Sequence, residues 1–245
     1  MEKMVKVLNV TVLPAFLATP DGKDKHPGII LIHEIWGLDD HIKDVTKRYA
    51  KERYVVLAPD LFAGTPIENA VSPNLFAEMG DPAKRDEAQK KMRAALAPMQ
   101  SPEFAKEMIH KLQKCFTYLE KQENCNGSIG VLGFCFGGSY SFALAAVEPK
   151  IKVAVPFYGQ APTEEKTEKI SCPVLAFYGE QDENLISTLP ELKDMMKKYN
   201  KDFEAIVYPN CGHAFFNDTN PNRYNKEAAT DAWKRTLTFL SENLK

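Results

Sequence analysis

Short continuous apolar segments, each as long as one strand, are the feature that most constrains how this chain can fold. Residues 28–32 read Gly-Ile-Ile-Leu-Ile and residues 54–59 read Tyr-Val-Val-Leu-Ala-Pro. Strands that are apolar on both faces are typical of a parallel sheet covered by helices on each side. Four further segments are predicted to be strands, at residues 128–134, 152–158, 173–178 and 203–208.

Helical patterns alternate with these strands along the chain. An alternating segment at residues 5–12 predicts the first strand of an N-terminal hairpin. Strand–helix alternation after such a hairpin predicts an α/β fold with a mostly parallel central sheet, N-terminal antiparallel strands and helices on both faces. The predicted helices lie at residues 41–53, 86–96, 102–121, 138–147, 189–199 and 226–243.

No internal repeat, low-complexity tract or Gly/Ser linker divides the sequence, which predicts a single domain over residues 1–245. Residues 61–122 hold a loop with prolines and glycines followed by two charged helical patterns, and we expect this variable section to lie over the site. Ligand sites of parallel sheets lie beyond the carboxyl ends of the strands. Chemistry is therefore expected just after the apolar segments.

Charge and cysteine content exclude several classes of protein. The 31 Lys and Arg residues nearly balance the 33 Asp and Glu residues, which argues against a nucleic-acid or anionic-membrane surface. No apolar stretch approaches the roughly 18–20 residues of a membrane span, and the N-terminus lacks the apolar core of a signal peptide. Five scattered cysteines without a Cys-x-x-Cys pair disfavour disulfides and zinc and predict reduced thiols in the cytoplasm.

A glycine-flanked cysteine follows the predicted strand at residues 128–134 and leads directly into a helix. The segment 133–138 reads Gly-Phe-Cys-Phe-Gly-Gly, which has the Gly-x-nucleophile-x-Gly spacing of a nucleophile elbow with Cys135 at its centre. Glycines suit the elbow because a Cβ at those positions would collide with the neighbouring strand or helix. The helix start favours a thiolate. The alternative is a glycine-rich turn around an ordinary buried cysteine.

The order of the following loops favours catalysis. In the α/β-hydrolase fold the nucleophile, acid and histidine come in this order, each after a successive strand. Asp182 follows the strand at 173–178 and His213 follows the strand at 203–208. We therefore predict a triad of Cys135, Asp182 and His213, in which His213 moves protons and Asp182 orients it. Glu180 and Glu183 flank Asp182 and are the alternatives to it.

The loop after residue 32 is the second element of the predicted site. In hydrolases this loop supplies one oxyanion-hole N–H, and the residue after the nucleophile supplies the other. We assign these donors to Ile35 and Phe136. Glu34 is expected beside the reaction centre. The alternative interpretation is that Glu34 is a solvated carboxylate at the end of a strand, with no role in the reaction.

The remaining histidines and aromatic residues complete the predictions. His26 is expected in a turn, and His41 and His110 on solvated helical faces. Trp36, Tyr158 and Phe215 are the predicted substrate-contacting residues, although most aromatic residues of this kind belong to the core or the pocket wall.

These motifs together resemble the dienelactone hydrolase family, the carboxymethylenebutenolidase-like branch of the α/β-hydrolases. The resemblance runs from about residue 10 to the terminal helix. It is carried by residues 33–37 (His-Glu-Ile-Trp-Gly), 58–62 (Ala-Pro-Asp-Leu-Phe), 133–138 and the Asp182 and His213 loops. It implies the α/β-hydrolase fold, with Cys135 as nucleophile, His213 as base and acid, Asp182 as its partner and Glu34 assisting thiolate formation.

The resemblance also implies an enzyme that needs no metal or organic cofactor and opens a small lactone or ester through an acyl-enzyme. Members that prefer acidic dienelactones hold the substrate carboxylate with arginines, one of them four residues beyond the catalytic histidine. This chain has Asn217 there, and neither Arg85 nor Arg93 aligns to the second arginine. Uncharged esters and lactones are therefore comparably expected as substrates.

Three alternatives stay open at this point: a broad carboxylesterase or thioesterase on the same triad, a non-catalytic binding module on a hydrolase scaffold, and a redox-sensing thiol protein. The expected partner is a small-molecule ester or lactone, with no nucleic acid and no membrane. The chain itself is expected to be a monomer or a small homo-oligomer.

Overall fold

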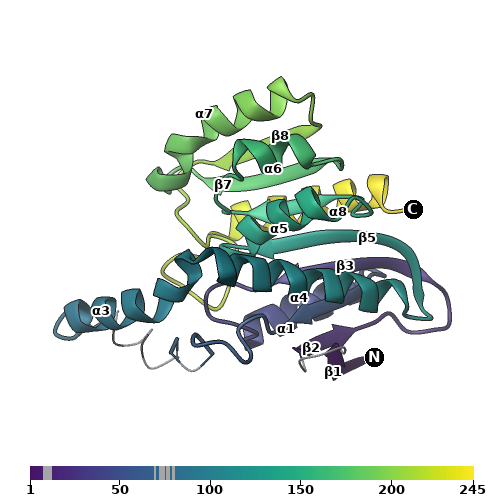
Figure 1. Cartoon of the computed structure of the whole chain (residues 1–245), viewed down its shortest axis with the longest axis horizontal. Coiled ribbons are helices and arrows are strands. Elements are labelled where there is room, and N and C mark those ends of the chain that lie inside the picture. The colour runs from purple at the N-terminus through teal and green to yellow at the C-terminus, as the bar shows by residue number, and fades with distance from the viewer. Residues whose placement is uncertain (8–12, 69, 72–74, 76–77, 79–80) are drawn as a thin grey trace.

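A single mixed sheet organises the computed structural model, which describes residues 1–7, 13–68, 70–71, 75, 78 and 81–245. Within these ranges eight strands are hydrogen-bonded in the order β1-β2-β4-β3-β5-β6-β7-β8 (Figure 1). The strands are β1 (Glu2–Val7), β2 (Leu13–Ala18), β3 (His26–Ile32), β4 (Val55–Pro59), β5 (Cys125–Phe134), β6 (Ala154–Phe157), β7 (Val174–Gly179) and β8 (Phe203–Tyr208).

Strand directions match the predicted architecture. β1 pairs antiparallel with β2, and β2 pairs antiparallel with β4. From β4 to β8 all neighbouring strands are parallel, and β3, β4 and β7 are buried almost throughout. The predicted mostly parallel sheet with N-terminal antiparallel strands is therefore confirmed. The first predicted strand is described only up to Val7, because residues 8–12 of that segment lie outside the described ranges.

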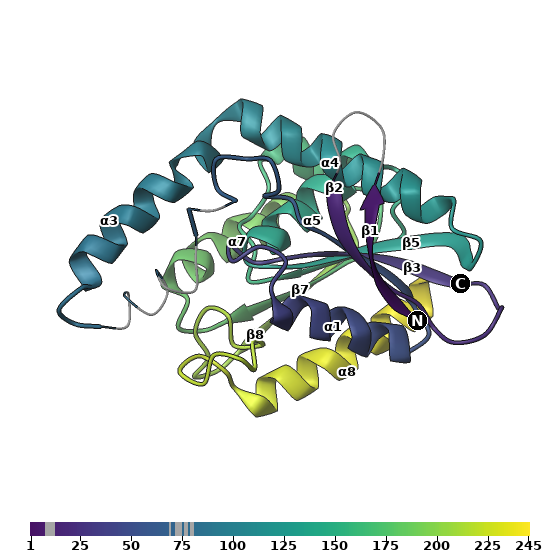
Figure 2. The same cartoon turned by 90° about the horizontal axis from the view of Figure 1, so that it is seen from below.

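Helices cover both faces of the sheet. In Figure 2, α1 and α8 lie on one face, and α4, α5 and α7 lie on the other. Side-chain caps start three of them, since Asp39, Ser101 and Asn225 each accept a hydrogen bond from a backbone N–H of the first turn. The helices are α1 (Asp40–Lys51), α3 (Arg85–Leu96), α4 (Pro102–Glu120), α5 (Phe136–Val147), α6 (Glu164–Lys169), α7 (Glu183–Lys198) and α8 (Lys226–Asn243), with a short 3-10 helix η1 (Ala97–Gln100).

Helices α7 and α6 differ most from the sequence prediction. α7 begins at Glu183, six residues before the predicted start at 189, although Pro190 then lies inside the helix. Its buried stripe of Leu185, Leu189, Leu192 and Met196 explains this, because packing that stripe on the core outweighs the proline. The short helix α6 was not predicted, because six residues are too few to show a periodic pattern.

The section 61–122 differs from the rest of the molecule in how it packs. α3 projects away from the body in both views (Figures 1 and 2). Its buried residues Ala88 and Met92 pack with Leu75 in a small cluster separate from the main core. α4 instead buries Met108, Leu112 and Leu119 against the sheet, in the main core.

Two histidine predictions were wrong. His41 is 2% exposed, because the side of α1 that carries it faces the sheet beside Ile42 and Val45. His26 is not in a turn but lies buried at the first position of β3. Its backbone N–H donates a hydrogen bond to the carbonyl of Asn124. His110 is exposed, as predicted. In the ranges that the structure describes, no helix combines the length and apolar composition needed to cross a membrane.

Candidate active site

Cys135 occupies a strained turn between the end of β5 and the start of α5. Its backbone has φ 56° and ψ −113°, a region that residues with a side chain rarely adopt. Two hydrogen bonds hold this conformation: the Cys135 N–H donates to the carbonyl of Phe157, and the Cys135 carbonyl accepts from Ser139 N–H. The cysteine therefore stands at the carboxyl edge of the parallel strands, where the sequence predicted the chemistry.

The glycines around Cys135 are required by close backbone contacts. A Cβ on Gly133 would lie 2.2 Å from the carbonyl oxygen of Gly137, and a Cβ on Gly137 would lie 2.3 Å from that of Ile32. Real Cβ atoms do not approach backbone atoms so closely. The Gly-x-Cys-x-Gly spacing thus lets the elbow pack directly against β3.

We expect Gly137→Ala to destabilise the protein by at least about 2 kcal/mol, because α5 or β3 must shift to make room for the methyl group. Urea unfolding of the purified variant measures this change. Gly212→Ala is the matched control, since a Cβ there meets nothing within 4 Å. Equal unfolding free energies for the two variants would contradict the packing argument.

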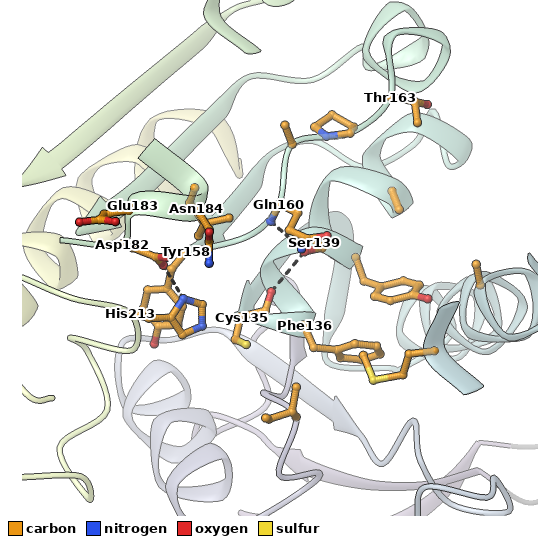
Figure 3. A pocket seen from close by; sticks show the side chains of 18 of the residues that line it. Cys135, Phe136, Ser139, Tyr158, Gln160, Thr163, Asp182, Glu183, Asn184 and His213 are labelled. Carbon is orange, nitrogen blue, oxygen red and sulfur yellow. Dashed lines mark hydrogen bonds and ion pairs between the residues drawn. The ribbon is translucent and has the colours of Figure 1, made fainter. Parts of the chain in front are cut away.

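Cys135, Asp182 and His213 line one cavity of about 920 Å³ (Figure 3). Its described walls come from segments far apart in the sequence. Of the section 61–122, the lining residues are Met99 from η1 and Ala105 and Ile109 from α4. These three residues form part of an apolar wall, so this section does contribute to the pocket.

His213 and Asp182 are brought together by the loops after β8 and β7. His213 Nδ1 lies 2.5 Å from Asp182 Oδ2, and the Asp182 side chain is only 10% exposed. The two alternative carboxylates are both exposed, and Glu180 accepts a hydrogen bond from the Asn210 N–H. Asp182 is therefore the carboxylate that contacts the histidine.

The opposite side of the imidazole faces Cys135 (Figure 3). Burial lowers the pKa of His213, but its interactions with Asp182 and Cys135 outweigh burial and raise this pKa to about 10. The imidazole of His213 is therefore held between the Asp182 carboxylate and the Cys135 side chain.

The other cysteines differ from Cys135 in their surroundings. All five are described and free, and Cys135 alone is partly exposed. Burial raises the pKa of the remaining four thiols, Cys115, Cys125, Cys172 and Cys211, which makes them poor nucleophiles. The described residues contain no group of three or more His, Cys, Asp and Glu side chains that could hold a metal ion.

Glu34 is buried, so the alternative interpretation, a solvated carboxylate at the end of a strand, is wrong. Its side chain is 2% exposed, and its Oε2 accepts a hydrogen bond of 2.7 Å from Asn217 Nδ2. Oε1 has no hydrogen-bond partner among the described residues. Burial raises the pKa of Glu34, although His41 and Asn217 act in the opposite direction. Asn217, four residues after His213, therefore binds Glu34.

The two predicted oxyanion donors, Ile35 and Phe136, both line the cavity. Neither N–H has a hydrogen-bond acceptor within the described ranges. Phe136 is the first residue of α5, where backbone N–H groups lack helical acceptors and carry partial positive charge. Two free backbone donors at the cavity wall are suited to an anionic oxygen.

Of the three predicted substrate-contacting aromatic residues, Tyr158 alone is among the described residues that line the cavity. Burial raises the pKa of Tyr158, and the nearby Glu34 and Cys135 raise it further. Phe215 is fully buried against Tyr158 and Tyr208, and Trp36 packs with the small cluster of α3. The structure therefore gives no support to substrate contact by Phe215 or Trp36.

Sequence reasoning missed several lining residues. Tyr140 and Ala143 lie four and seven positions after Phe136, so helical spacing from the elbow could have found them. The exposed cations Lys166 and Arg223 also line the cavity, and Arg223 lies 3.4 Å from the His213 carbonyl. No local pattern marks these two, because their position depends on how distant loops meet.

Comparison with known proteins identifies the family of the chain. The family model described as "Dienelactone hydrolase family" matches residues 13–244. A protein of Saccharolobus solfataricus named "Putative carboxymethylenebutenolidase" is 37% identical over 246 residues and covers 92% of each chain. A protein of the same name from Synechocystis is 29% identical, covering 95% of this chain and 93% of its own.

A similar fold occurs in a structure from Klebsiella pneumoniae titled "Crystal Structure of Putative Dienelactone Hydrolase". It has a TM-score of 0.80 and 24% sequence identity, and the match covers 98% of each chain. This likeness confirms the predicted α/β-hydrolase architecture. Because the family model covers nearly the whole chain, the protein belongs to the dienelactone hydrolase family, whose members hydrolyse lactones and esters.

Proposed function

We propose that this lactone or ester hydrolase works through a triad of Cys135, His213 and Asp182 and an acyl-enzyme intermediate. One observation carries the proposal: the His213–Asp182 pair faces a cysteine held in a strained elbow, and all three line one cavity. This arrangement supports the roles of nucleophile for Cys135, base for His213 and orienting acid for Asp182.

The proposed reaction begins when the Cys135 thiolate adds to the carbonyl carbon of the substrate. The carbonyl oxygen becomes an oxyanion, which the N–H groups of Ile35 and Phe136 stabilise. Collapse forms the thioester and expels the alkoxide, which takes its proton from His213. His213 then removes a proton from water, the hydroxide attacks the thioester, and Cys135 leaves as a thiolate.

Glu34 is proposed to help convert Cys135 into its thiolate. The Glu34 side chain is buried, and Tyr158 interacts with both Glu34 and Cys135. Burial disfavours the charged form of a carboxylate and raises the pKa of Glu34, which favours transfer of a proton to it.

Glu34→Gln is expected to lower kcat and to shift the pH–rate profile while stabilising the fold at high pH. The folded-state pKa of Glu34 is raised, so the folded chain holds this proton more tightly than the unfolded chain. The stability that protonated Glu34 contributes is therefore lost as pH rises through that pKa. Glutamine does not ionise, so the variant does not lose stability in this way. Urea unfolding at pH 4.5 and pH 8 tests the sign: a gain that is equal at both pH values, or an unchanged pH–rate profile, argues against this role.

The walls of the cavity suggest substrates beyond acidic dienelactones. The side-chain amide of Asn217 donates its hydrogen bond to Glu34. Lys166 and Arg223, the two cationic side chains among the described residues that line the cavity, are exposed. A cavity of about 920 Å³ also accommodates larger acyl or alcohol groups. Uncharged aryl esters and lactones are therefore proposed as substrates beside acidic ones. A cytoplasmic location is part of the proposal, since all five described cysteines are free.

A panel of lactones, aryl esters and aryl thioesters tests the proposed function, with Cys135→Ala measured in parallel. We expect turnover of at least one lactone or oxygen ester by the wild-type enzyme. Turnover confined to thioesters would identify a thioesterase, and no turnover of any member would favour a binding module. Mass spectrometry of the acid-quenched reaction should show the acyl group on the peptide that contains Cys135.

A further inference from the structure

A buried imidazole lies between the two arms of the proposed oxyanion hole and takes no part in the mechanism above. His33 follows the last residue of β3 directly, and its exposed fraction is zero. Its ring stacks on Phe136, with centroids 5.7 Å apart and planes at 14°, and meets Phe62 edge-on. Burial lowers the pKa of His33, so the ring is neutral at physiological pH.

Two backbone contacts fix the tautomer of this ring. Nε2 lies 3.1 Å from the Leu61 nitrogen, and Nδ1 lies 2.6 Å from the Glu34 carbonyl oxygen. A backbone N–H can only donate and a carbonyl oxygen can only accept. Nε2 is therefore the unprotonated nitrogen, and Nδ1–H donates to Glu34.

The Glu34 carbonyl and the Ile35 N–H belong to the same peptide unit. In a trans peptide these two groups point in opposite directions, and the described chain contains no cis peptide. Two donors hold the carbonyl, namely His33 Nδ1–H and the Gly37 N–H at 3.3 Å. The Ile35 N–H is thereby turned away from the His33 ring, and it has no acceptor within the described ranges.

His33 also contacts the other arm of the oxyanion hole. Its backbone carbonyl accepts a hydrogen bond of 3.1 Å from the Gly137 N–H, directly after Phe136. One residue thus connects the Ile35 loop, the start of α5 and, through Leu61, the beginning of the section over the pocket.

We propose that His33 is a positioning residue for the oxyanion hole: its Nδ1–H aims the Ile35 N–H at the developing negative charge. The proposal rests on the proposed function, because it assumes that an oxyanion forms at this place. A hydrogen bond to the carbonyl also polarises the peptide and makes its N–H a stronger donor. His33 itself does not touch the substrate.

His33→Asn and His33→Gln provide a matched pair of variants. The shorter asparagine amide would stand near the Nδ1 position and keep a donor for the Glu34 carbonyl, whereas the longer glutamine amide would stand near Nε2 and keep only the Leu61 contact. Removing one oxyanion donor typically costs about 100-fold or more in kcat. For 4-nitrophenyl acetate we expect His33→Gln to lower kcat at least about 20-fold and His33→Asn to keep it within about threefold, with KM within about threefold in both.

Two chemical probes separate this role from general damage to the site. A benzyl trifluoromethyl ketone adds to the thiolate and places an oxyanion in the hole, so its affinity should fall in His33→Gln in parallel with kcat. Alkylation of Cys135 by iodoacetamide forms no oxyanion, so its rate should stay within about twofold of wild type. Equal loss of kcat in both variants, or a matching loss of alkylation rate, would overturn the positioning role.

A measurement on the wild-type protein does not depend on either variant folding. Long-range ¹H–¹⁵N NMR of the His33 ring at pH 7 should show the neutral Nδ1–H tautomer, as the contacts with Glu34 and Leu61 require. The Nε2–H tautomer would overturn the proposal. Failure of the proposed function is distinguishable, because Cys135→Ala would then keep full ester hydrolysis whatever His33 does.

Discussion

Cys135→Ala is expected to reduce ester and lactone hydrolysis by at least about 10⁴-fold. Alanine cannot form the acyl-enzyme, so the only remaining route is direct attack by water on substrate bound at the oxyanion donors. In serine proteases, binding and the oxyanion hole alone retain about 10³–10⁴-fold catalysis over water when the nucleophile is removed. Steady-state kinetics with 4-nitrophenyl acetate and a lactone measure the loss.

The stability of the same variant should barely change. Cys135 is partly exposed, so truncation to alanine should change the free energy of unfolding by less than about 1 kcal/mol. Cys172→Ala is the control, because Cys172 is buried and is not among the described residues of the cavity wall. That control should lose stability but keep kcat. Full activity in Cys135→Ala would reject the proposed mechanism.

Asp182→Asn is expected to lower kcat by about 10³–10⁴-fold, the size of the effect of the same change in a serine-protease triad. The Asn amide can donate to His213 Nδ1 and thereby select the wrong tautomer. Glu180→Gln and Glu183→Gln are the matched controls, since both side chains are exposed and should leave kcat within about twofold of wild type. A large loss in either control, with Asp182→Asn active, would reassign the orienting acid.

The Asp182 variant should also show a characteristic pH dependence of stability. The pKa of His213 is raised from 6.5 to about 10 in the folded state, and Asp182 is one of the two groups that raise it. The stabilisation from protonated His213 is complete below the unfolded pKa of about 6.5 and is lost as pH rises through about 10. The stability difference between wild type and Asp182→Asn should therefore be larger at pH 6 than at pH 10, as measured by urea unfolding.

The sheet could be predicted from the sequence because buried parallel strands must be apolar on both faces. Residues 28–32 and 54–59 show this pattern, and β8 and α8 have the predicted bounds. His41 and α7 could not be predicted in the same way. Burial of His41 depends on the rotation of α1 against the sheet, and the start of α7 depends on packing that outweighs Pro190.

The convergence of Cys135, Asp182 and His213 on one cavity could be predicted because it depends on the order of the strands. Cys135, Asp182 and His213 each follow a strand of one parallel sheet, so their strand order determines that they meet at the same edge. The residues that form the wall of the cavity could not be predicted from the order of the strands. Trp36 stands two residues after Glu34 but packs with Leu75 and Met92, whereas Met99 and Ile109 reach the cavity from the section over it.

The contrast between Cys135 and the four buried thiols has a practical consequence. A small alkylating reagent at limiting dose should modify a single sulfur per folded chain. The amount of reagent consumed then measures the concentration of folded chains with an accessible Cys135. The four buried thiols react only after the protein unfolds. Thiol alkylation with and without denaturant can therefore measure both the concentration of folded enzyme and the total amount of protein in a preparation.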